Sequence, residues 1–268
     1  MKTHTKRLGT ACFLTLLLGV TPALAAAPEG FTGTLTGSYA NDSCNGCGGH
    51  IDNWAVNGQG AFGFGPSDIG AEVDLGYMRS SGTGFDVDTW GIGGNVFWAP
   101  AFGRFGGTVD WTRYNLPGPD FDTVTYGGFG EFYASPFITV GGNVGGLHFS
   151  TTGFSADGTY AGGGITGYVM PDLGLTGAIN WIHLDHSIGD ATAWTVMAEW
   201  LVNEDVPVSV FGGYTNTDPF AGGSHSNTWF LGLRFYFSNT PMTLVDHHRN
   251  GSLDSLVTTN TALLRTSF

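Results

Sequence analysis

The chain has 268 residues, of which 41% are hydrophobic and 14% aromatic, and its net charge at pH 7 is −13. This hydrophobic content argues against a disordered chain. The negative charge makes nucleic acid an unsuitable partner, because phosphates are bound by Lys and Arg. After residue 25 no run approaches 18 consecutive apolar residues, so no transmembrane helix is expected there.

The first 25 residues have the pattern of a secretory signal peptide. Lys2, Lys6 and Arg7 precede an apolar run over 8–20, and Ala23-Leu24-Ala25 is a small-x-small cleavage site. An apolar run of 13 residues is too short for a hydrocarbon core of about 30 Å. We therefore expect cleavage after Ala25 or Ala27, with 1–25 as the signal peptide, and export of the rest, which has six arginines, no lysine and 22 acidic residues.

Proline recurs along the remaining sequence at intervals of 34 to 38 residues, at Pro28, Pro66, Pro100, Pro136, Pro171, Pro207 and Pro241. Proline cannot donate a hydrogen bond to a sheet, so it marks turns or strand ends. Between successive prolines lie two runs of roughly ten residues, the strand length of a membrane barrel, separated by a polar segment. The spacing predicts six strand-loop-strand units.

The twelve predicted strands are 31–40, 54–64, 68–78, 88–98, 103–114, 122–133, 137–149, 158–169, 173–183, 191–202, 206–215 and 227–237. Several alternate clearly: Ile69, Val73 and Leu75 share one face of their strand, while Glu72 and Asp74 share the other. The glycine-rich strand 158–169 shows no clear alternation.

Tryptophan helps to distinguish a membrane barrel from a soluble β-sandwich, which also alternates. All eight tryptophans fall on the apolar phase, mostly near strand ends. Trp90 and Trp98 lie eight residues apart on one face, about 19 Å along the membrane normal at a tilt near 45°. That separation suits the two aromatic girdles of a transmembrane barrel, whereas a sandwich core gives no reason for it.

The connections predict the orientation. Those around the prolines are short, whereas 41–53, 79–87, 115–121, 150–157, 184–190 and 216–226 are longer and polar. In outer-membrane barrels short turns face the periplasm and long loops face outside. We therefore expect an all-β, antiparallel up-and-down barrel over 26–238, with both termini in the periplasm and a periplasmic extension over 239–268.

The last predicted strand carries a more specific resemblance. Gly232, Phe235 and Phe237 lie in Gly-Leu-Arg-Phe-Tyr-Phe, which resembles the C-terminal assembly signal of porin-like outer-membrane β-barrel proteins. The resemblance implies a Gram-negative outer membrane and contact with lipid, lipopolysaccharide and the barrel-assembly machinery. The chain departs from the family pattern because 239–268 continue beyond this strand.

Three polar motifs stand apart from the strand pattern, and none indicates a cofactor or metal. Cys44 and Cys47, in an exported loop, are expected to form a local disulfide. His183, Asp185 and His186 raise the alternative of a hydrolase, because some twelve-stranded outer-membrane enzymes use His and Asp at this rim. No serine or acidic partner pattern accompanies them, so we expect no enzyme. His247, His248 and Arg249 are expected to be solvated periplasmic residues.

The inner face is the main functional lead. Lipid-facing charges are penalised in a barrel, so we expect these charged residues to line the lumen: Glu72, Asp74, Arg104, Asp110, Glu131, Glu199 and Arg234. Antiparallel pairing through loop 115–121 places Arg104 opposite Glu131. The excess of acids predicts a narrow channel for passive diffusion of small, preferably cationic solutes. A non-conducting structural or surface-interaction barrel is the alternative.

Overall fold

The computed structural model describes residues 30–44, 50–64, 67–82, 85–116, 118–185, 189–203, 207–218, 225–238 and 242–251. The predicted signal peptide, Pro66, Cys47 and the side chain of Cys44 fall outside this part of the chain. The predicted Cys44–Cys47 disulfide therefore lies outside the described residues.

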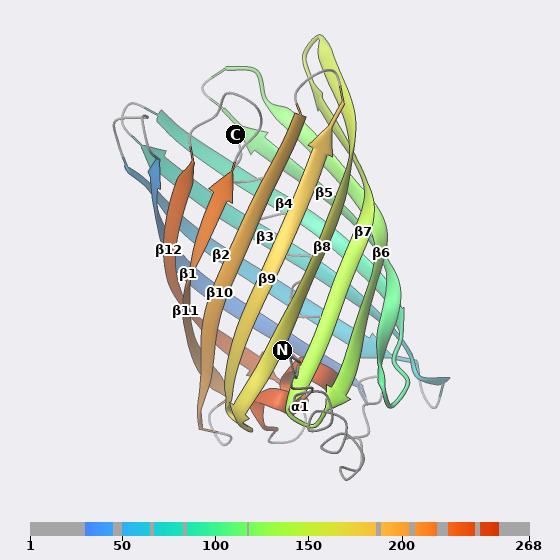
Figure 1. Cartoon of the computed structure of the whole chain (residues 1–268). Helices are drawn as coiled ribbons and strands as arrows, with labels where there is room; N and C mark the ends of the chain where they lie inside the picture. The colour runs from blue at the N-terminus through green and yellow to red at the C-terminus, as the bar shows by residue number, and fades with distance from the viewer. Residues whose placement is uncertain are drawn as a thin grey trace, which may run out of the picture.

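The described residues form one closed antiparallel barrel in which each strand pairs with its neighbours in sequence (Figure 1). Its strands are β1 (Phe31–Cys44), β2 (His50–Gly63), β3 (Ile69–Gly82), β4 (Phe85–Trp98), β5 (Gly103–Asn115), β6 (Phe121–Ser135), β7 (Ile138–Thr151), β8 (Phe154–Met170), β9 (Leu173–Leu184), β10 (Gly189–Asn203), β11 (Val208–Asp218) and β12 (Ser226–Phe237). The prediction of a twelve-stranded up-and-down barrel is confirmed, and a two-sheet sandwich is excluded.

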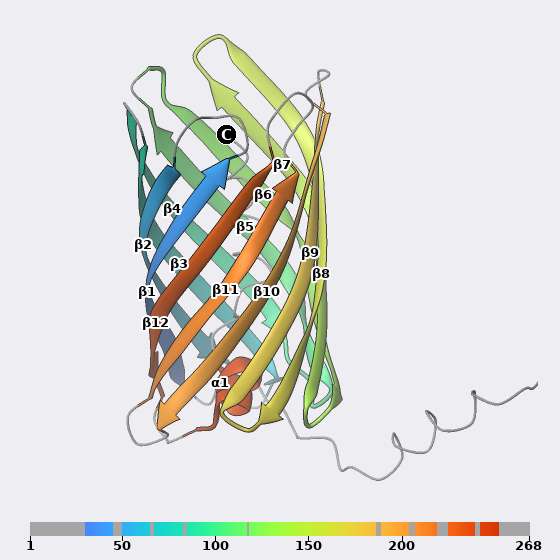
Figure 2. The same ribbon diagram turned by 60° about the vertical axis from the view of Figure 1, so that its left-hand side comes forward.

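β1 and β12 close the barrel (Figure 2). Their ladder runs from Gly33 opposite Phe237 to Cys44 opposite Ser226. Closure leaves no strand edge with unpaired backbone groups, which hydrocarbon would not tolerate. Among the described residues no helix is long and apolar enough to cross a membrane.

The strands extend farther toward the long loops than the sequence predicts. β1 continues to Cys44 instead of ending at residue 40, and β2 begins at His50 instead of 54. The hairpins keep pairing through polar residues, and Asp52 accepts hydrogen bonds from Tyr39 (2.5 Å) and Asn41 (2.8 Å). The alternating hydrophobicity ends where the apolar outer surface ends, but the backbone hydrogen bonds between strands continue beyond it. The sequence pattern therefore underestimates the length of these strands.

The described prolines of the repeat lie at one end of the barrel. Pro100, Pro136, Pro171 and Pro207 fall in or beside the connections β4–β5, β6–β7, β8–β9 and β10–β11. The first turn is closed by the Gly103 amide, which donates to the Pro100 carbonyl at 2.9 Å. We call this end the proline rim and the opposite end the loop rim. In Figure 1 the proline rim is at the bottom.

The outer face is apolar and carries two different aromatic belts. The half near the loop rim holds Trp54, Trp90, Trp111, Trp181, Trp194 and Trp229. Toward the proline rim, Trp98 contacts Phe102 and Phe105, with ring centroids 6.1 and 6.3 Å apart. Between the belts, residues such as Leu75, Val109 and Val144 are more than half exposed. This surface is suited to a bilayer, with aromatic side chains at both interfaces.

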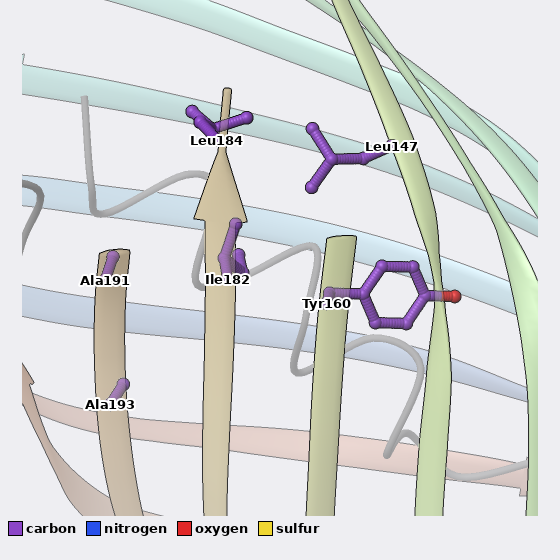
Figure 3. Packing of buried hydrophobic residues seen from close by; sticks show 6 residues of the cluster. All are labelled: Leu147, Tyr160, Ile182, Leu184, Ala191 and Ala193. Carbon is purple, nitrogen blue, oxygen red and sulfur yellow. The ribbon is translucent and has the colours of Figure 1, made fainter. Parts of the chain in front are cut away.

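Glycines on the inner face make room for aromatic rings that lie against the wall. Tyr160 occupies the space that a Cβ would need at Gly127 and at Gly145. It also belongs to an inward-facing cluster with Leu147, Ile182, Leu184, Ala191 and Ala193 (Figure 3). β8 therefore has a clear phase, with Tyr160 buried and Ile165 exposed. The sequence hides it because tyrosine points inward and glycine and alanine occupy part of the outer face.

The outer face predicts a depth-dependent cost for charge. Val144, in the middle of β7, is 64% exposed, and Val202, near the proline-rim end of β10, is 49% exposed. We expect Val144→Arg to lower the free energy of unfolding in lipid vesicles by about 2–4 kcal/mol and Val202→Arg by about 0–1 kcal/mol. Urea titrations of the two variants measure this difference, and equal costs would contradict the assigned membrane position.

Candidate functional site in the barrel lumen

The structure places all seven predicted lumen residues on the face opposite the exposed apolar side chains. Glu72 lies beside the exposed Val73, and Arg104 beside the exposed Phe105. Toward the proline rim these charges form two ion pairs, Arg104–Glu131 and Arg234–Glu199. A separate acidic stretch, formed by Glu72, Asp74 and Asp110, lies on β3 and β5. We call it the acidic wall.

The first ion pair joins β5 and β6. Arg104 and Glu131 are register partners, and Arg104 Nη2 lies 2.8 Å from Glu131 Oε2. The structure thus brings together the pair that antiparallel pairing predicts. The side chains are 1% and 12% exposed, so solvent screens their attraction little.

The second ion pair spans the seam where the barrel closes. Arg234 Nη1 on β12 lies 2.7 Å from Glu199 Oε2 on β10, with β11 between them. Ser209 and Tyr236 also donate to Glu199. Arg234 Nε donates to Thr36 Oγ1 on β1 at 3.2 Å. One network therefore links four consecutive strands across the β1–β12 seam.

In the acidic wall, neutral side chains donate hydrogen bonds to the carboxylates, and Arg104 acts on Glu72 electrostatically. Asn95 Nδ2 donates to Glu72 at 3.3 Å and to Asp74 at 2.8 Å. Thr108 and Thr125 donate to Asp110 at 3.0 and 3.4 Å. A neutral donor does not cancel the negative charge of the carboxylate that it binds.

Asp74 and Asp110 face each other across Gly93. Gly93 is the register partner of both, and the Asp110 carboxylate fills the space that a Cβ at Gly93 would need. A shallow hollow beside them is lined by Gln59, Asn57 and these three residues, among others. Glu72 is only 2% exposed, whereas Asp74 and Asp110 are half-buried. The two aspartates are therefore the carboxylates of this wall that are better placed to meet a solute.

The described part of the tail does not extend into solvent. Helix α1 (Leu244–Asn250) lies within the barrel at the proline rim (Figure 1, Figure 2). His247 is 3% and Arg249 is 2% exposed, so the prediction that they are solvated is wrong. A helix signal was present in the sequence, because Thr243 at the N-cap and Asp246 in the first turn form a capping box.

The C-terminal end of α1 is bound to the wall through its carbonyl groups. Arg104 donates to the His248 carbonyl at 2.5 Å and to the Gly251 carbonyl at 2.9 Å. Tyr133 Oη donates to the Arg249 carbonyl at 3.1 Å. The last carbonyls of a helix lack partners within it and favour a nearby cation. Arg104 therefore binds both Glu131 and α1.

Side chains of α1 bind several other strands. Arg249 donates to the carbonyls of Ser135 (2.7 Å), at the end of β6, and Ile138 (3.2 Å), at the start of β7. His248 Nδ1 lies 3.0 Å from Tyr168 Oη, and its Nε2 lies 3.4 Å from Glu199 Oε2. Leu244 is fully buried against Leu201 and Tyr236. Among the described residues, Arg249 therefore joins Arg104 and Arg234 as an arginine of the lumen that the sequence did not predict.

The His–Asp pairs at the loop rim recur on three hairpins. His183 Nδ1 lies 2.9 Å from Asp190 and its Nε2 lies 3.6 Å from Asp185. His148–Asp157 (2.7 Å) and His225–Asp218 (3.4 Å) repeat the arrangement. Because the pairing recurs, His183 has the geometry of a cross-strand polar contact; His186 falls outside the described residues.

Comparisons with known proteins identify the fold. No family model and no curated protein sequence matches the chain. An outer-membrane channel from Pseudomonas putida F1 is similar, with a TM-score of 0.59 and 12% identity over 80% of this chain and 98% of that one. The translocator domain of the autotransporter NalP from Neisseria meningitidis has a TM-score of 0.55 and 13% identity, over 83% and 94%. The β-domain of the Bordetella autotransporter BrkA gives 0.52 and 10%, over 77% and 99%. The chain has the fold of Gram-negative outer-membrane barrels.

The seam network predicts a large cost for removing one charge. Glu199→Gln leaves the buried Arg234 without its anionic partner, and breaking a buried ion pair typically costs about 3–5 kcal/mol. Asp86→Asn is the matched control, because its pair with Arg79 is about half exposed and should contribute less than about 1 kcal/mol. Urea unfolding followed by tryptophan fluorescence measures both. Similar midpoints for the two variants would contradict the role of the seam.

Acid should weaken the docking of α1. Burial, with a smaller contribution from His248, lowers the pKa of His247 to about 4. Its ring stacks on that of Tyr236 of β12, with centroids 4.1 Å apart. The negative charges of Asp246 on α1 and Glu199 on β10 act in the opposite direction and raise the pKa of His247. An undocked histidine has a pKa near 6.5. The docked state therefore binds fewer protons, and its stability should decline as the pH falls from about 6.5 toward 4.

Nuclear magnetic resonance titration of the histidine rings in detergent micelles measures this prediction. We expect the His247 signal to titrate near pH 4 and to disappear in His247→Phe, which keeps an aromatic ring against Tyr236. A midpoint near 6.5 would show that His247 is solvated while α1 is docked.

Proposed function

We propose that the protein is a narrow outer-membrane channel for the passive diffusion of small solutes, with a preference for cations, and that it is not an enzyme. The observation that carries this proposal is the acidic wall. Its half-buried carboxylates Asp74 and Asp110 have neutral hydrogen-bond donors, whereas Glu131 and Glu199 are paired with arginines. Rings or clusters of acids in a narrow lumen favour cations.

The fold supports a transport role. A closed barrel with an apolar outside and a charged inside is the arrangement of outer-membrane channels. The similar structure from Pseudomonas putida F1 is a channel, at 12% identity. The similarity to autotransporter domains means that fold alone does not decide among barrel functions, so the proposal depends on the inner wall.

The loop lengths support an orientation. We place the proline rim, α1 and both termini on the periplasmic side, because short turns face the periplasm in this class. Lipopolysaccharide and the barrel-assembly machinery are the partners proposed from this location and from the Gly232–Phe237 strand.

A non-conducting structural barrel is the second candidate, and the observations that favour it are the packed parts of the lumen. Tyr160 and its apolar cluster project inward, and α1 lies within the proline rim. If these groups fill the bore, the carboxylates of the acidic wall only form hydrogen bonds within the barrel and meet no solute. Conductance in a planar bilayer separates the two candidates.

The test of the channel is the reversal potential under a KCl gradient. We expect cation preference in the parent and a reduced preference in Asp74→Asn/Asp110→Asn, because lumen substitutions tune selectivity. The matched control is Asp157→Asn/Asp190→Asn, which removes the same charge from exposed positions at the loop rim. The difference should shrink at 1 M salt, where the screening length is about 3 Å. Anion preference in the parent would defeat the proposal, and absence of conductance would favour the structural barrel.

A further inference from the structure

We propose that α1 is a plug that restricts passage through the proline rim and undocks to open it. This inference rests on the channel function proposed above. It assigns a regulatory role to α1, which the porin-like resemblance does not account for.

The geometry that carries the proposal is that α1 binds opposite walls. Tyr133 belongs to β6 and Tyr236 to β12, and these strands are six positions apart in the twelve-membered ring. Tyr133 binds the Arg249 carbonyl, and Tyr236 stacks on His247. A helix that contacts both strands must cross the bore instead of lying along one side of it.

The contacts of α1 favour docking but leave it separable from the barrel. The β12–β1 ladder closes the wall without any residue of α1. The helix is held mainly by the side chains of Arg104, Tyr133, Tyr168 and Glu199, and by one backbone hydrogen bond from the Val245 amide to the Pro171 carbonyl at 3.1 Å. Its length of seven residues is too short to be stable alone in water. Undocking and unfolding of α1 should therefore occur together, without opening the barrel wall.

A purely structural brace is the alternative that the experiment must separate. Four proteins are compared in planar bilayers: the full chain, a chain ending at Ser238, a chain ending at Gly251 that keeps α1, and full-length Leu244→Asp/Arg249→Ala. Leu244 is fully buried and Arg249 binds the adjoining ends of β6 and β7, so the double substitution should release the helix without shortening the chain.

We expect single-channel conductance to rise severalfold in the chain ending at Ser238 and in Leu244→Asp/Arg249→Ala. The chain ending at Gly251 should conduct like the full chain. If all four conduct equally, α1 is a brace and the plug is refuted. The double-substituted chain decides the question if the shortened chain fails to fold.

A second measurement keeps the plug testable if no protein conducts. Thr108, 6% exposed, lies on the inner face of β5, four residues from Arg104 in the direction of the loop rim. With Cys44 and Cys47 replaced by Ser, Thr108→Cys is labelled with a small water-soluble thiol reagent. Faster labelling after release of α1 supports the plug even when the channel function fails. An unchanged labelling rate overturns the plug whether or not the barrel conducts.

Discussion

Backbone hydrogen bonding is the constraint on which the rest of this structure depends. In hydrocarbon every amide and carbonyl needs a partner within the protein, and a β-sheet meets this requirement only by closing. Pairing of β1 with β12 completes the ring and fixes which face of each strand points outward. The buried Arg234, which contacts Glu199 and Thr36, ties the strands on both sides of that closing seam.

Closure creates a narrow interior in which each charge needs a defined environment. Arg104 and Arg234 neutralise Glu131 and Glu199 near the proline rim, and Arg104 also binds the carbonyl end of α1. Asp74 and Asp110 instead accept hydrogen bonds from neutral groups. The interior is thus divided into a region of paired charges, where α1 docks, and an acidic wall with a negative field. We assign the proposed cation selectivity to the acidic wall and the proposed restriction of passage to the region where α1 docks.

Much of the barrel could be predicted from the sequence, because proline spacing and alternation report directly on turns and faces. The Arg104–Glu131 contact followed from counting through a hairpin. The phase of β8 could not be predicted, since Tyr160 points inward over glycines of neighbouring strands. The docking of α1 could not be predicted either. Its capping box indicates a helix, but the sequence of residues 243–251 does not show that Arg104 and Tyr133 bind this helix. Contacts between distant segments are the part that residue patterns do not encode.

The central claim is that the acidic wall gives this barrel a cation-preferring path through the membrane. Its most direct test is the swelling of liposomes carrying the full chain in isosmotic solutions of a small organic cation and of an organic anion of matched size. The account predicts that the cation enters faster than the anion and faster than into protein-free liposomes. Equal or faster entry of the anion would contradict it.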